Sequence, residues 1–335
     1  VTENRVLALP PKYSLSGIRS EIWRKQFESY VGDHVGLRLL ALFWYNRLHL
    51  TLFEESPIEK VAIGKDGWLF YVAEGAAENY HGTNLFSSEE LAFMTARVKS
   101  DADRLKEKGI TYLLVLVPEK QSIYGEFLQD GFRPLPTIRP YDQFVTYLRN
   151  HTDVPFLDTK PLLLKAKASE QVYHKTDTHW NDVGAYYAYE EIINMLKEAQ
   201  PKVGTPFTVE RTTSSTLGGD LSELLLQRQR TQEQKVVLTP VTNRQLQNLP
   251  VTVRNPKPER PILAMGVDDE ELPRAIMFRD SFGEALIPWL SWHMEKITYI
   301  WTPRIEYDIV DAEKPDIVIQ EISERYIGKL LEIRK

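Results

Sequence analysis

Cysteine is absent from this chain of 335 residues, which excludes disulfide bonds and thiolate ligands for a metal. The absence does not fix the compartment, because cytosolic and secreted bacterial proteins both do without cysteine. A long apolar run is also lacking. The nearest approach, "LLALFWYNRLHLTLF" from Leu39, is broken by Asn46, Arg47 and His49 before it reaches the roughly 18 residues of a membrane helix. This segment is typical of an amphipathic helix that is buried on one side.

An excess of positive charge is lacking as well. The chain has 41 Lys and Arg residues against 47 Asp and Glu residues, a net charge of −6, and the basic residues are scattered. Proteins that bind phosphate backbones usually carry a basic stripe, so we do not expect nucleic acid as a partner. With 42% hydrophobic and 26% charged residues, the composition is that of a folded globular protein.

The N-terminal part has the pattern of helices. Apolar residues recur at intervals of three and four from about Ser16 to Phe53. The next segment, "VAIGKDGWLFY", is split by Gly64 and by the Asp66-Gly67 pair, which is a strong signal for a β-hairpin turn. We predict an N-terminal helical segment over residues 1–60 that packs on the core, and one main domain over residues 61–335.

The main domain alternates helix and strand patterns. A helix from Glu89 to Lys108 precedes "ITYLLVLVP", which is apolar enough to be a central strand that is buried on both faces. Further strands are predicted at "VPFLD", "RAIMF", "KITYIWT" and "PDIVIQEI", with helices between them. Enrichment in Thr, Gln, Asn and Pro over about 204–260 interrupts this rhythm and predicts an inserted β-rich excursion. The fold class is therefore α/β with a central, mostly parallel sheet.

The stretch "VYHKTDTHWND" gathers His174, Asp177 and His179 in a chain with only seven histidines. These side chains offer N and O ligands that could bind a metal ion. Asp177 and His179 are two residues apart, so on an extended segment they face the same way, and the carboxylate could orient the imidazole as in a nucleophilic triad. A third interpretation is a polar turn in which Asp177 caps the helix that begins near Asn181.

The stretch "RAIMFRDSFGEAL" places Ser281 where a strand passes into a helix-compatible sequence. A serine at such a turn exposes its hydroxyl at the carboxyl end of the sheet and turns its own N–H toward an oxyanion, which is the geometry of acyl chemistry. The alternative is a serine that caps the following helix. With Asp177 and His179 as partners the catalytic interpretation is favoured, because a metal site would leave Ser281 without a role.

Seven further residues are weaker candidates. Lys120 and Tyr124 follow the strand "ITYLLVLVP", at the edge where parallel sheets bind ligands. The backbone N–H groups of Gly219 and Asp220 could reach an oxyanion hole. Alternatively, these four residues could support the catalytic residues from behind. Three aromatic residues could stack on sugar rings, although such residues more often belong to a core: Trp68, Tyr173 and Trp180.

Five motifs, taken in order, carry a family resemblance: "VAIGKDGWLFY", "VPEKQSIYGEFL", "KTDTHWND", "GGDLSELL" and "FRDSFG". Together they resemble the alginate-type polysaccharide O-acetyltransferase family, which has an SGNH hydrolase-like domain. The resemblance extends from about Glu3 to the C-terminal "PDIVIQEISERYI". It implies a three-layer α/β sandwich of permuted connectivity, in which the Asp/His pair precedes the serine in the chain.

The resemblance also implies roles for the site residues. Ser281 would be the nucleophile, His179 the general base and Asp177 its orienting acid, with no cofactor and no metal. The reaction would move an acetyl group through an acyl-serine to hydroxyls of an extracellular polysaccharide, such as that of a biofilm. Two alternatives stay open: a serine carbohydrate esterase on the same triad, and a metal-dependent hydrolase that uses His174, Asp177 and His179.

The expected partners follow from the same resemblance. They are a polysaccharide acceptor and a membrane-bound O-acyltransferase that relays the acetyl group. We therefore expect an extracytoplasmic location in a bacterium, in the periplasm or on the outer face of the cell membrane. The full-length protein would have an N-terminal membrane anchor that precedes Val1.

Overall fold

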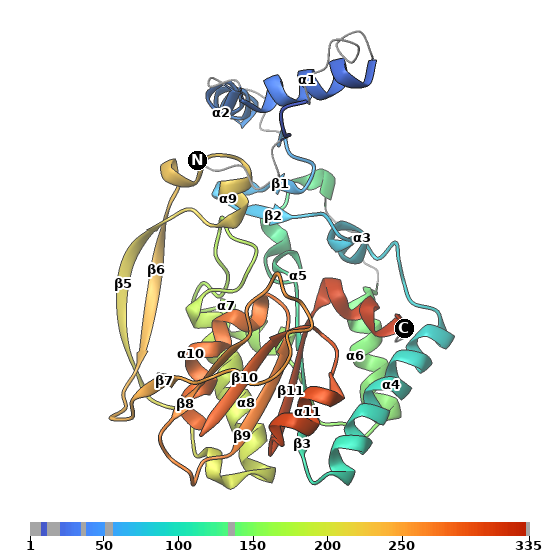
Figure 1. The fold of residues 1–335 in the computed structure, drawn as a ribbon, viewed down its shortest axis with the longest axis vertical. Coiled ribbons are helices and arrows are strands. Elements are labelled where there is room, and N and C mark those ends of the chain that lie inside the picture. The colour runs from blue at the N-terminus through green and yellow to red at the C-terminus, as the bar shows by residue number, and fades with distance from the viewer. Residues whose placement is uncertain (1–7, 12–20, 35–37, 51–55, 133–137, 333–335) are drawn as a thin grey trace.

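The computed structural model describes residues 8–11, 21–34, 38–50, 56–132 and 138–332. Its largest unit is a seven-stranded sheet of order β4-β3-β11-β9-β10-β8-β7 (Figure 1). The strands from β4 to β10 in this order are parallel, and β8 and β7 extend one edge in antiparallel fashion. The strands are β3 Thr111–Val117, β4 Phe156–Asp158, β7 Leu246–Asn248, β8 Leu263–Val267, β9 Arg274–Arg279, β10 Lys296–Trp301 and β11 Ile317–Ser323.

The most apolar segment of the chain forms β3, but β3 is not the central strand. Only the three residues of β4 lie outside it, whereas β9 occupies the middle of the sheet. A strand has a continuously apolar sequence whenever helices cover both of its faces, whatever its position in the strand order of the sheet. The prediction of burial on both faces is confirmed and the prediction of a central place is wrong. Strand β8 and the short β7 were not predicted.

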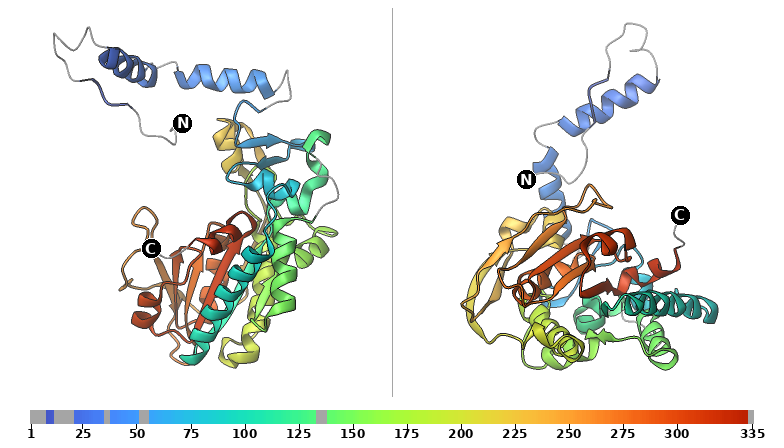
Figure 2. Two further views of the ribbon diagram at one scale, coloured as in Figure 1. Left: turned by 90° about the vertical axis from the view of Figure 1, so that its right-hand side faces the viewer. Right: turned by 60° about the horizontal axis from the view of Figure 1, so that its bottom comes forward.

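Helices cover both faces of the sheet (Figure 2). Two apolar clusters form, one with side chains from α7, α8 and α10, the other with side chains from α4, α6 and α11. The predicted three-layer α/β class is confirmed. The helices of these two layers are α4 Ser88–Glu107, α6 Pro140–His151, α7 Thr159–Lys167, α8 Asp182–Ala199, α10 Ile287–Leu290 and α11 Tyr307–Glu313.

Side-chain caps fix where two of these helices begin. Ser87 and Glu90 form a capping box at the start of α4. At the start of α8 the side chain of Asn181 accepts hydrogen bonds from the N–H groups of Val183 and Gly184. Because Asn181 satisfies these groups, Asp177 is not the cap of α8, and the interpretation of the histidine-rich stretch as a capping turn is wrong.

The predicted N-terminal hairpin is present. β1 Val61–Ile63 and β2 Leu69–Tyr71 pair antiparallel. Asp66 and Gly67 between them have φ values of 54° and 79°, the left-handed region that favours such a pair in a tight turn. The hairpin lies beyond the carboxyl ends of the parallel strands (Figure 1), together with α3 Ala76–His81 and α5 Lys120–Tyr124.

The inserted segment forms a second, separate hairpin. β5 Val209–Leu217 and β6 Gln232–Pro240 pair over nine residues each, and α9 Asp220–Leu224 lies in the connection between them. The last part of the predicted insertion joins the main sheet through β7, which pairs with β8. The boundaries at 204 and 260 stay a prediction.

Two helices precede the hairpin β1–β2: α1 Glu21–His34 and α2 Arg38–Leu48. In the part of the predicted segment 1–60 that the structure describes, they lie outside the three layers (Figure 2). Asn46 of α2 donates a hydrogen bond to the carbonyl of Leu225 at 3.0 Å. The described helices include none that combines the length and the apolar character needed to cross a membrane. The domain boundary at residue 60 stays a prediction, and residues 1–7 and 12–20 lie outside the described ranges.

Short 3₁₀ helices complete the description of the chain. Two of them follow the carboxyl ends of strands β9 and β11 directly and so line the same edge of the sheet. They are η3 Lys65–Gly67, η4 Gly125–Phe127, η5 Asp130–Phe132, η6 Pro201–Val203, η7 Arg228–Arg230, η8 Phe282–Leu286, η9 Ser291–His293 and η10 Glu324–Leu331.

Close packing of α8 against the segment before it depends on Gly184. A Cβ atom there would lie 2.3 Å from the carbonyl oxygen of Val172. We expect Gly184→Ala to lower the free energy of unfolding by about 1–3 kcal/mol, measured by urea denaturation, because backbone atoms must move. The control is Gly131→Ala, where a Cβ meets nothing within 4 Å and the change should stay within about 0.5 kcal/mol. Equal losses in the two variants would contradict this account.

Candidate active site

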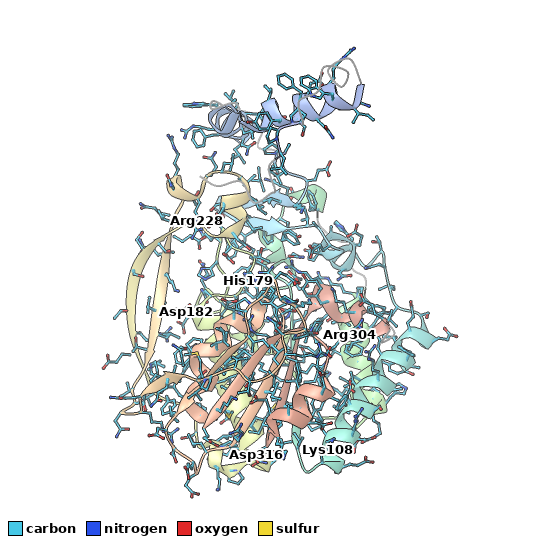
Figure 3. The ribbon with its side chains drawn as sticks, viewed as in Figure 1. Lys108, His179, Asp182, Arg228, Arg304 and Asp316 are labelled. Carbon is cyan, nitrogen blue, oxygen red and sulfur yellow. The ribbon has the colours of Figure 1, made fainter. Side chains whose placement is uncertain are left out.

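The predicted site residues meet at the carboxyl edge of the parallel strands. Figure 3 shows His179 at the end of the sheet opposite to Lys108 and Asp316, which precede strands β3 and β11. A cleft of about 570 Å³ opens at this edge, and Asp177, His179 and Ser281 all line it. Two segments just over a hundred residues apart in sequence therefore form one site.

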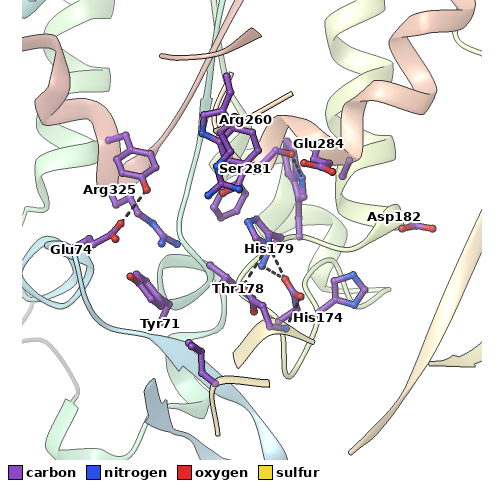
Figure 4. Close-up of a pocket in the computed structure, with 18 residues that line it drawn as sticks. Tyr71, Glu74, His174, Thr178, His179, Asp182, Arg260, Ser281, Glu284 and Arg325 are labelled. Carbon is purple, nitrogen blue, oxygen red and sulfur yellow. Dashed lines mark hydrogen bonds and ion pairs between the residues drawn. The ribbon is translucent and has the colours of Figure 1, made fainter. Parts of the chain in front are cut away.

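Asp177 and His179 form a hydrogen-bonded pair. The Nδ1 atom of His179 lies 2.7 Å from Oδ1 of Asp177, and the backbone N–H of His179 donates to the same oxygen at 3.0 Å. The second oxygen, Oδ2, accepts from the backbone N–H of Asp220 at 3.0 Å. Both carboxylate oxygens are thus hydrogen-bonded, and the carboxylate holds the imidazole in one orientation (Figure 4).

The pair shifts the pKa of both partners. Burial alone would raise the pKa of Asp177, but the hydrogen bond and charge of His179 and the backbone N–H donors outweigh it and hold that pKa well below its usual range. Burial alone would lower the pKa of His179, but the hydrogen bond and charge of Asp177 and the charge of Asp220 raise it above its usual value. Asp177 therefore stays ionised and makes His179 a stronger base.

The other side of the imidazole faces the cleft without a partner. Nε2 of His179 is buried and has no hydrogen-bond partner among the described residues. Because Nδ1 donates its proton to Asp177, Nε2 carries the lone pair. Ser281 follows β9, and its hydroxyl neither caps the following helix nor makes any other hydrogen bond in the described part of the chain. The site thus presents a hydroxyl and an oriented, unoccupied base (Figure 4).

Buried carboxyl groups shape the turn that carries Ser281. Asp280 accepts the N–H of Phe282 through Oδ1, at 2.9 Å, and both the N–H and the hydroxyl of Ser323 through Oδ2. Glu321 accepts the N–H groups of Asp280 and Gly283 at 2.9 and 3.1 Å. Burial, and then the charge of Asp280, raise the pKa of Glu321 well above its usual range.

Lys120 and Tyr124 support the segment that carries Asp177. Lys120 is 1% exposed, and its ammonium donates to the carbonyls of His174, Lys175 and Asp177 at 3.1, 3.1 and 2.6 Å. Burial lowers the pKa of Lys120 to about 8, so that it stays mainly protonated near neutral pH. The hydroxyl of Tyr124 accepts the N–H of Val172 at 3.0 Å. Both residues lie behind the cleft and do not face it.

Gly219 and Asp220 support the catalytic acid through their backbone N–H groups. The N–H of Gly219 donates to the hydroxyl of Thr176 at 2.9 Å, and the N–H of Asp220 donates to Asp177. Since both donors are engaged, the structure supports the second of the two predicted roles rather than a place in an oxyanion hole. They position the acid instead: a Cβ atom on Gly219 would lie 2.3 Å from Cβ of Asp177.

The three aromatic candidates for sugar stacking belong to the core. Tyr173 and Trp180 are 0% and 1% exposed, and Trp68 is buried against Tyr124. The indole N–H of Trp180 donates to the carbonyl of Phe282 at 2.9 Å, and Tyr173 donates to the carbonyl of Pro118. Stacking on a sugar needs an exposed ring face, which Tyr173 and Trp180 do not offer in this structure.

The metal set of His174, Asp177 and His179 does not assemble. His174 turns toward Glu233 of β6, with 3.7 Å between Nδ1 and Oε2. Among the described residues, the histidine and acidic ligand atoms that lie within 4.8 Å of one another belong to Asp177, His179 and Asp220. Hydrogen bonds already occupy both oxygens of Asp177, and Oδ1 of Asp220 accepts the N–H of Thr178 at 2.7 Å. This donor set fits an oriented imidazole better than a metal ion.

Four residues at the site were not found from the sequence. Asp280 and Glu321 shape the serine turn, and Glu233 accepts the N–H groups of Lys175 and Thr176. Arg325 lines the cleft. The available signal was position: Asp280 adjoins Ser281, and Arg325 comes two residues after a strongly apolar strand.

A comparison with family models decides where this chain belongs. Residues 61–257 match the family described as SGNH hydrolase-like domain, acetyltransferase AlgX. The chain belongs to this AlgX family. The matched residues include Asp177 and His179 and end before Ser281. Among curated proteins, the chain is 26% identical over 209 residues to the probable alginate O-acetylase AlgJ of Pseudomonas syringae pv. tomato, which spans 61% of this chain and 50% of that protein. It thus covers about half the length of such relatives.

Solved structures share the fold of this AlgX-family chain. The O-acetyltransferase domain of Pseudomonas putida AlgJ has a TM-score of 0.52 at 20% identity, over 82% of this chain and 93% of that domain. Bacillus cereus PatB1 has a TM-score of 0.59 at 16% identity, over 81% of this chain and 98% of the other. The resemblance inferred from the five motifs is confirmed.

Lys120 offers a test of how the site segment is held in this AlgX-family member. Lys120→Met keeps the length of the side chain but leaves three carbonyl groups without their donor. We expect a loss of about 1–3 kcal/mol in the free energy of unfolding, measured by chemical denaturation. The control is Lys65→Met, which removes an ion pair to Asp130 between half-exposed and exposed side chains and should cost less than about 1 kcal/mol. A smaller loss at Lys120 than at Lys65 would contradict the bracing role.

The hydrogen bond between Asp177 and His179 predicts the pH dependence of ester hydrolysis. The base must be neutral, so kcat/KM falls as the pH drops through the pKa of His179, which Asp177 raises. In Asp177→Asn the two contributions of Asp177 that raise the pKa of His179 are gone, while burial and the charge of Asp220 remain, so the acid limb should move to lower pH while kcat falls about 10⁴-fold. The measurement is kcat/KM for 4-nitrophenyl acetate between pH 5 and about 9. An acid limb that stays in place, or moves up, would refute the pairing.

Proposed function

We propose that this chain is the acyl-transfer domain of a polysaccharide O-acetyltransferase that works through an acetyl-serine on Ser281. One observation carries the proposal. Nε2 of His179 is buried, unpaired and oriented by Asp177, in the cleft that Ser281 also lines. An oriented base beside a serine at a strand-to-helix turn is the arrangement that nucleophilic acyl transfer requires.

The first half-reaction loads the enzyme. His179 takes the proton of Ser281, whose Oγ attacks the carbonyl carbon of the acetyl donor. The tetrahedral intermediate then expels the donor's alcohol, which receives the proton from His179. Asp177 stays ionised throughout and stabilises the imidazolium that forms between the two proton transfers, in keeping with its depressed pKa.

The second half-reaction delivers the acetyl group to an acceptor. A sugar hydroxyl gives its proton to His179 and attacks the acetyl-serine, and Ser281 leaves as an alcohol. Water is chemically similar to a sugar hydroxyl, so a carbohydrate esterase on the same three residues is the second candidate. The names of relatives as alginate O-acetylases and of AlgJ's O-acetyltransferase domain favour transfer over hydrolysis.

Location and partners form the outer part of the proposal. A polysaccharide acceptor fits the substrate that the relatives' names give. Acetylation of an exported polymer would place the domain outside the cytoplasm, where thioester donors are absent. A membrane-bound O-acyltransferase would then relay the acetyl group, and an anchor in the full-length protein would hold the domain near it.

The decisive experiment follows the acetyl group. The protein is incubated with 4-nitrophenyl acetate, with and without candidate polysaccharides, and mass spectrometry locates the label. We expect acetyl-Ser281 without an acceptor and loss of the label to the polymer when the right acceptor is present. Ser281→Ala and His179→Ala should each lower turnover by about 10⁶-fold.

The matched control is Ser222→Ala, because the hydroxyl of Ser222 is buried and bonded to the carbonyl of Gly219. Ser222→Ala removes a buried serine hydroxyl but leaves the nucleophile in place, so it shows how much activity is lost through lower stability alone. Near-normal acetyl transfer by Ser281→Ala would contradict the proposal. Release of free acetate in the presence of every acceptor tested would instead establish the esterase.

A further inference from the structure

The turn after β11 brings Arg325 to the same edge as Ser281. β11 and β9 are parallel neighbours with Gln320 opposite Phe278; β9 ends one residue after this pair, at Arg279, and β11 continues to Ser323 at the same edge of the sheet. Ser281 comes two residues after β9, and Arg325 comes two residues after β11. The hydrogen bonds from Ser323 to Asp280, at 2.8 and 2.7 Å, tie the two turns together.

The guanidinium of Arg325 is held rigidly from behind. Nε and Nη2 donate to the two oxygens of Glu119 at 2.5 and 2.6 Å, and the side chains of Arg325 and Glu119 are 7% and 1% exposed. The guanidinium also lies over the ring of Tyr71, 4.5 Å from its centroid. A two-pronged carboxylate contact with a flanking ring fixes the plane of the group.

One nitrogen of Arg325 is left over. Nη1 makes no hydrogen bond to any described residue, although the side chain lines the cleft. In Figure 4 the side chain of Arg325 ends in the space between Tyr71 and His179. The ring of Phe282 lies close to both His179 and Arg325. Its centroid is 4.9 Å from the centroid of the His179 ring and 6.0 Å from the guanidinium carbon of Arg325.

The backbone alone supplies one oxyanion donor at this turn. The N–H of Phe282 is bonded to Asp280 and that of Gly283 to Glu321. The N–H groups of Gly219 and Asp220 are engaged behind the acid. Within the described chain, the N–H of Ser281 itself is left without an acceptor. A tetrahedral oxyanion usually receives two or more donors, so a side chain must complete the set.

We propose that Nη1 of Arg325 is the second oxyanion donor, which makes Arg325 a catalytic residue. The inference rests on the proposed acyl transfer. As the bond from Ser281 Oγ to the carbonyl carbon forms, the electron pair of the C=O double bond moves to oxygen. That oxygen accepts from the N–H of Ser281 and from Nη1. When the pair returns, the bond to the departing alcohol breaks, and His179 protonates the alcohol.

A second arginine at the cleft lacks these properties. Arg260 is exposed, and its guanidinium lies over the ring of Trp301 with 4.4 Å to the centroid. Among the residues that the structure describes, no carboxylate forms an ion pair with its guanidinium. Preorganised donors stabilise a developing charge because they need no reorientation during the reaction, which favours the buried and braced Arg325.

The test compares Arg325→Lys, Arg325→Met and Arg325→Ala with Arg304→Lys, a matched arginine whose partner is Glu332 and which lies outside the cleft lining. The substrate is 4-nitrophenyl acetate, and only the rate that Ser281→Ala abolishes is counted. We expect kcat/KM to fall about 10²–10³-fold in Arg325→Met, less in Arg325→Lys, and to stay near normal in Arg304→Lys.

Two further measurements separate an oxyanion donor from a structural brace. Affinity for phenylboronic acid, which forms a tetrahedral adduct with Ser281, should fall in parallel with kcat/KM across the Arg325 variants. Guanidinium chloride at millimolar concentration should partly restore the Ser281-dependent turnover of Arg325→Ala.

Undiminished boronate affinity in Arg325→Lys and Arg325→Met, or Ser281-dependent turnover within threefold of wild type in Arg325→Met, would overturn the proposal. If the Met and Ala variants fail to fold, Arg325→Lys decides the question by the boronate measurement. Failure of the acyl transfer itself would appear separately, as turnover that survives Ser281→Ala.

Discussion

The carboxylate of Asp177 is the point on which the geometry of the site depends. It lies on the irregular connection between helices α7 and α8, where no helix or strand ladder fixes it. Two backbone N–H groups and one imidazole converge on its two oxygens, and the ammonium of Lys120 holds the surrounding carbonyls. A charged group this well solvated by the protein keeps its charge when buried, so the polarisation of His179 does not depend on water.

The sheet provides the second half of the arrangement. Parallel strands end at a common edge of the sheet. The turns after the neighbouring strands β9 and β11 therefore place Ser281 and Arg325 at the same edge, although the two residues are far apart in sequence. The carboxyl groups of Asp280 and Glu321 are a further consequence of this edge. They replace the missing ladder partners of the N–H groups just beyond the strands, which is why polar groups occur in an otherwise apolar layer.

Much of this architecture could be predicted from the sequence, and the limits have physical causes. Asp177, His179 and Ser281 stood out because the spacing of two residues and the strand-to-helix turn are local patterns. The α/β class followed from helix and strand periodicity. The burial of Tyr173 and Trp180 could not be predicted, because aromatic residues pack in cores and on cleft walls with the same local sequence. The engagement of the Gly219 and Asp220 amides depends on a contact across more than forty residues. Arg325 was missed because its importance comes from Glu119, about two hundred residues earlier.

The β5–β6 hairpin has a consequence for how this family can vary. Its connection presses Gly219 against Asp177, and its second strand contributes Glu233 to the segment that carries the acid. The inserted hairpin therefore acts as a clamp that holds the segment carrying Asp177 in place. When this hairpin differs between relatives, whether by nature or by engineering, the residues that contact the site segment must be kept. The exposed residues along its strands are free to change. A chimaera that preserves the sheet but replaces the clamp would inherit the fold and lose the alignment of its acid and base.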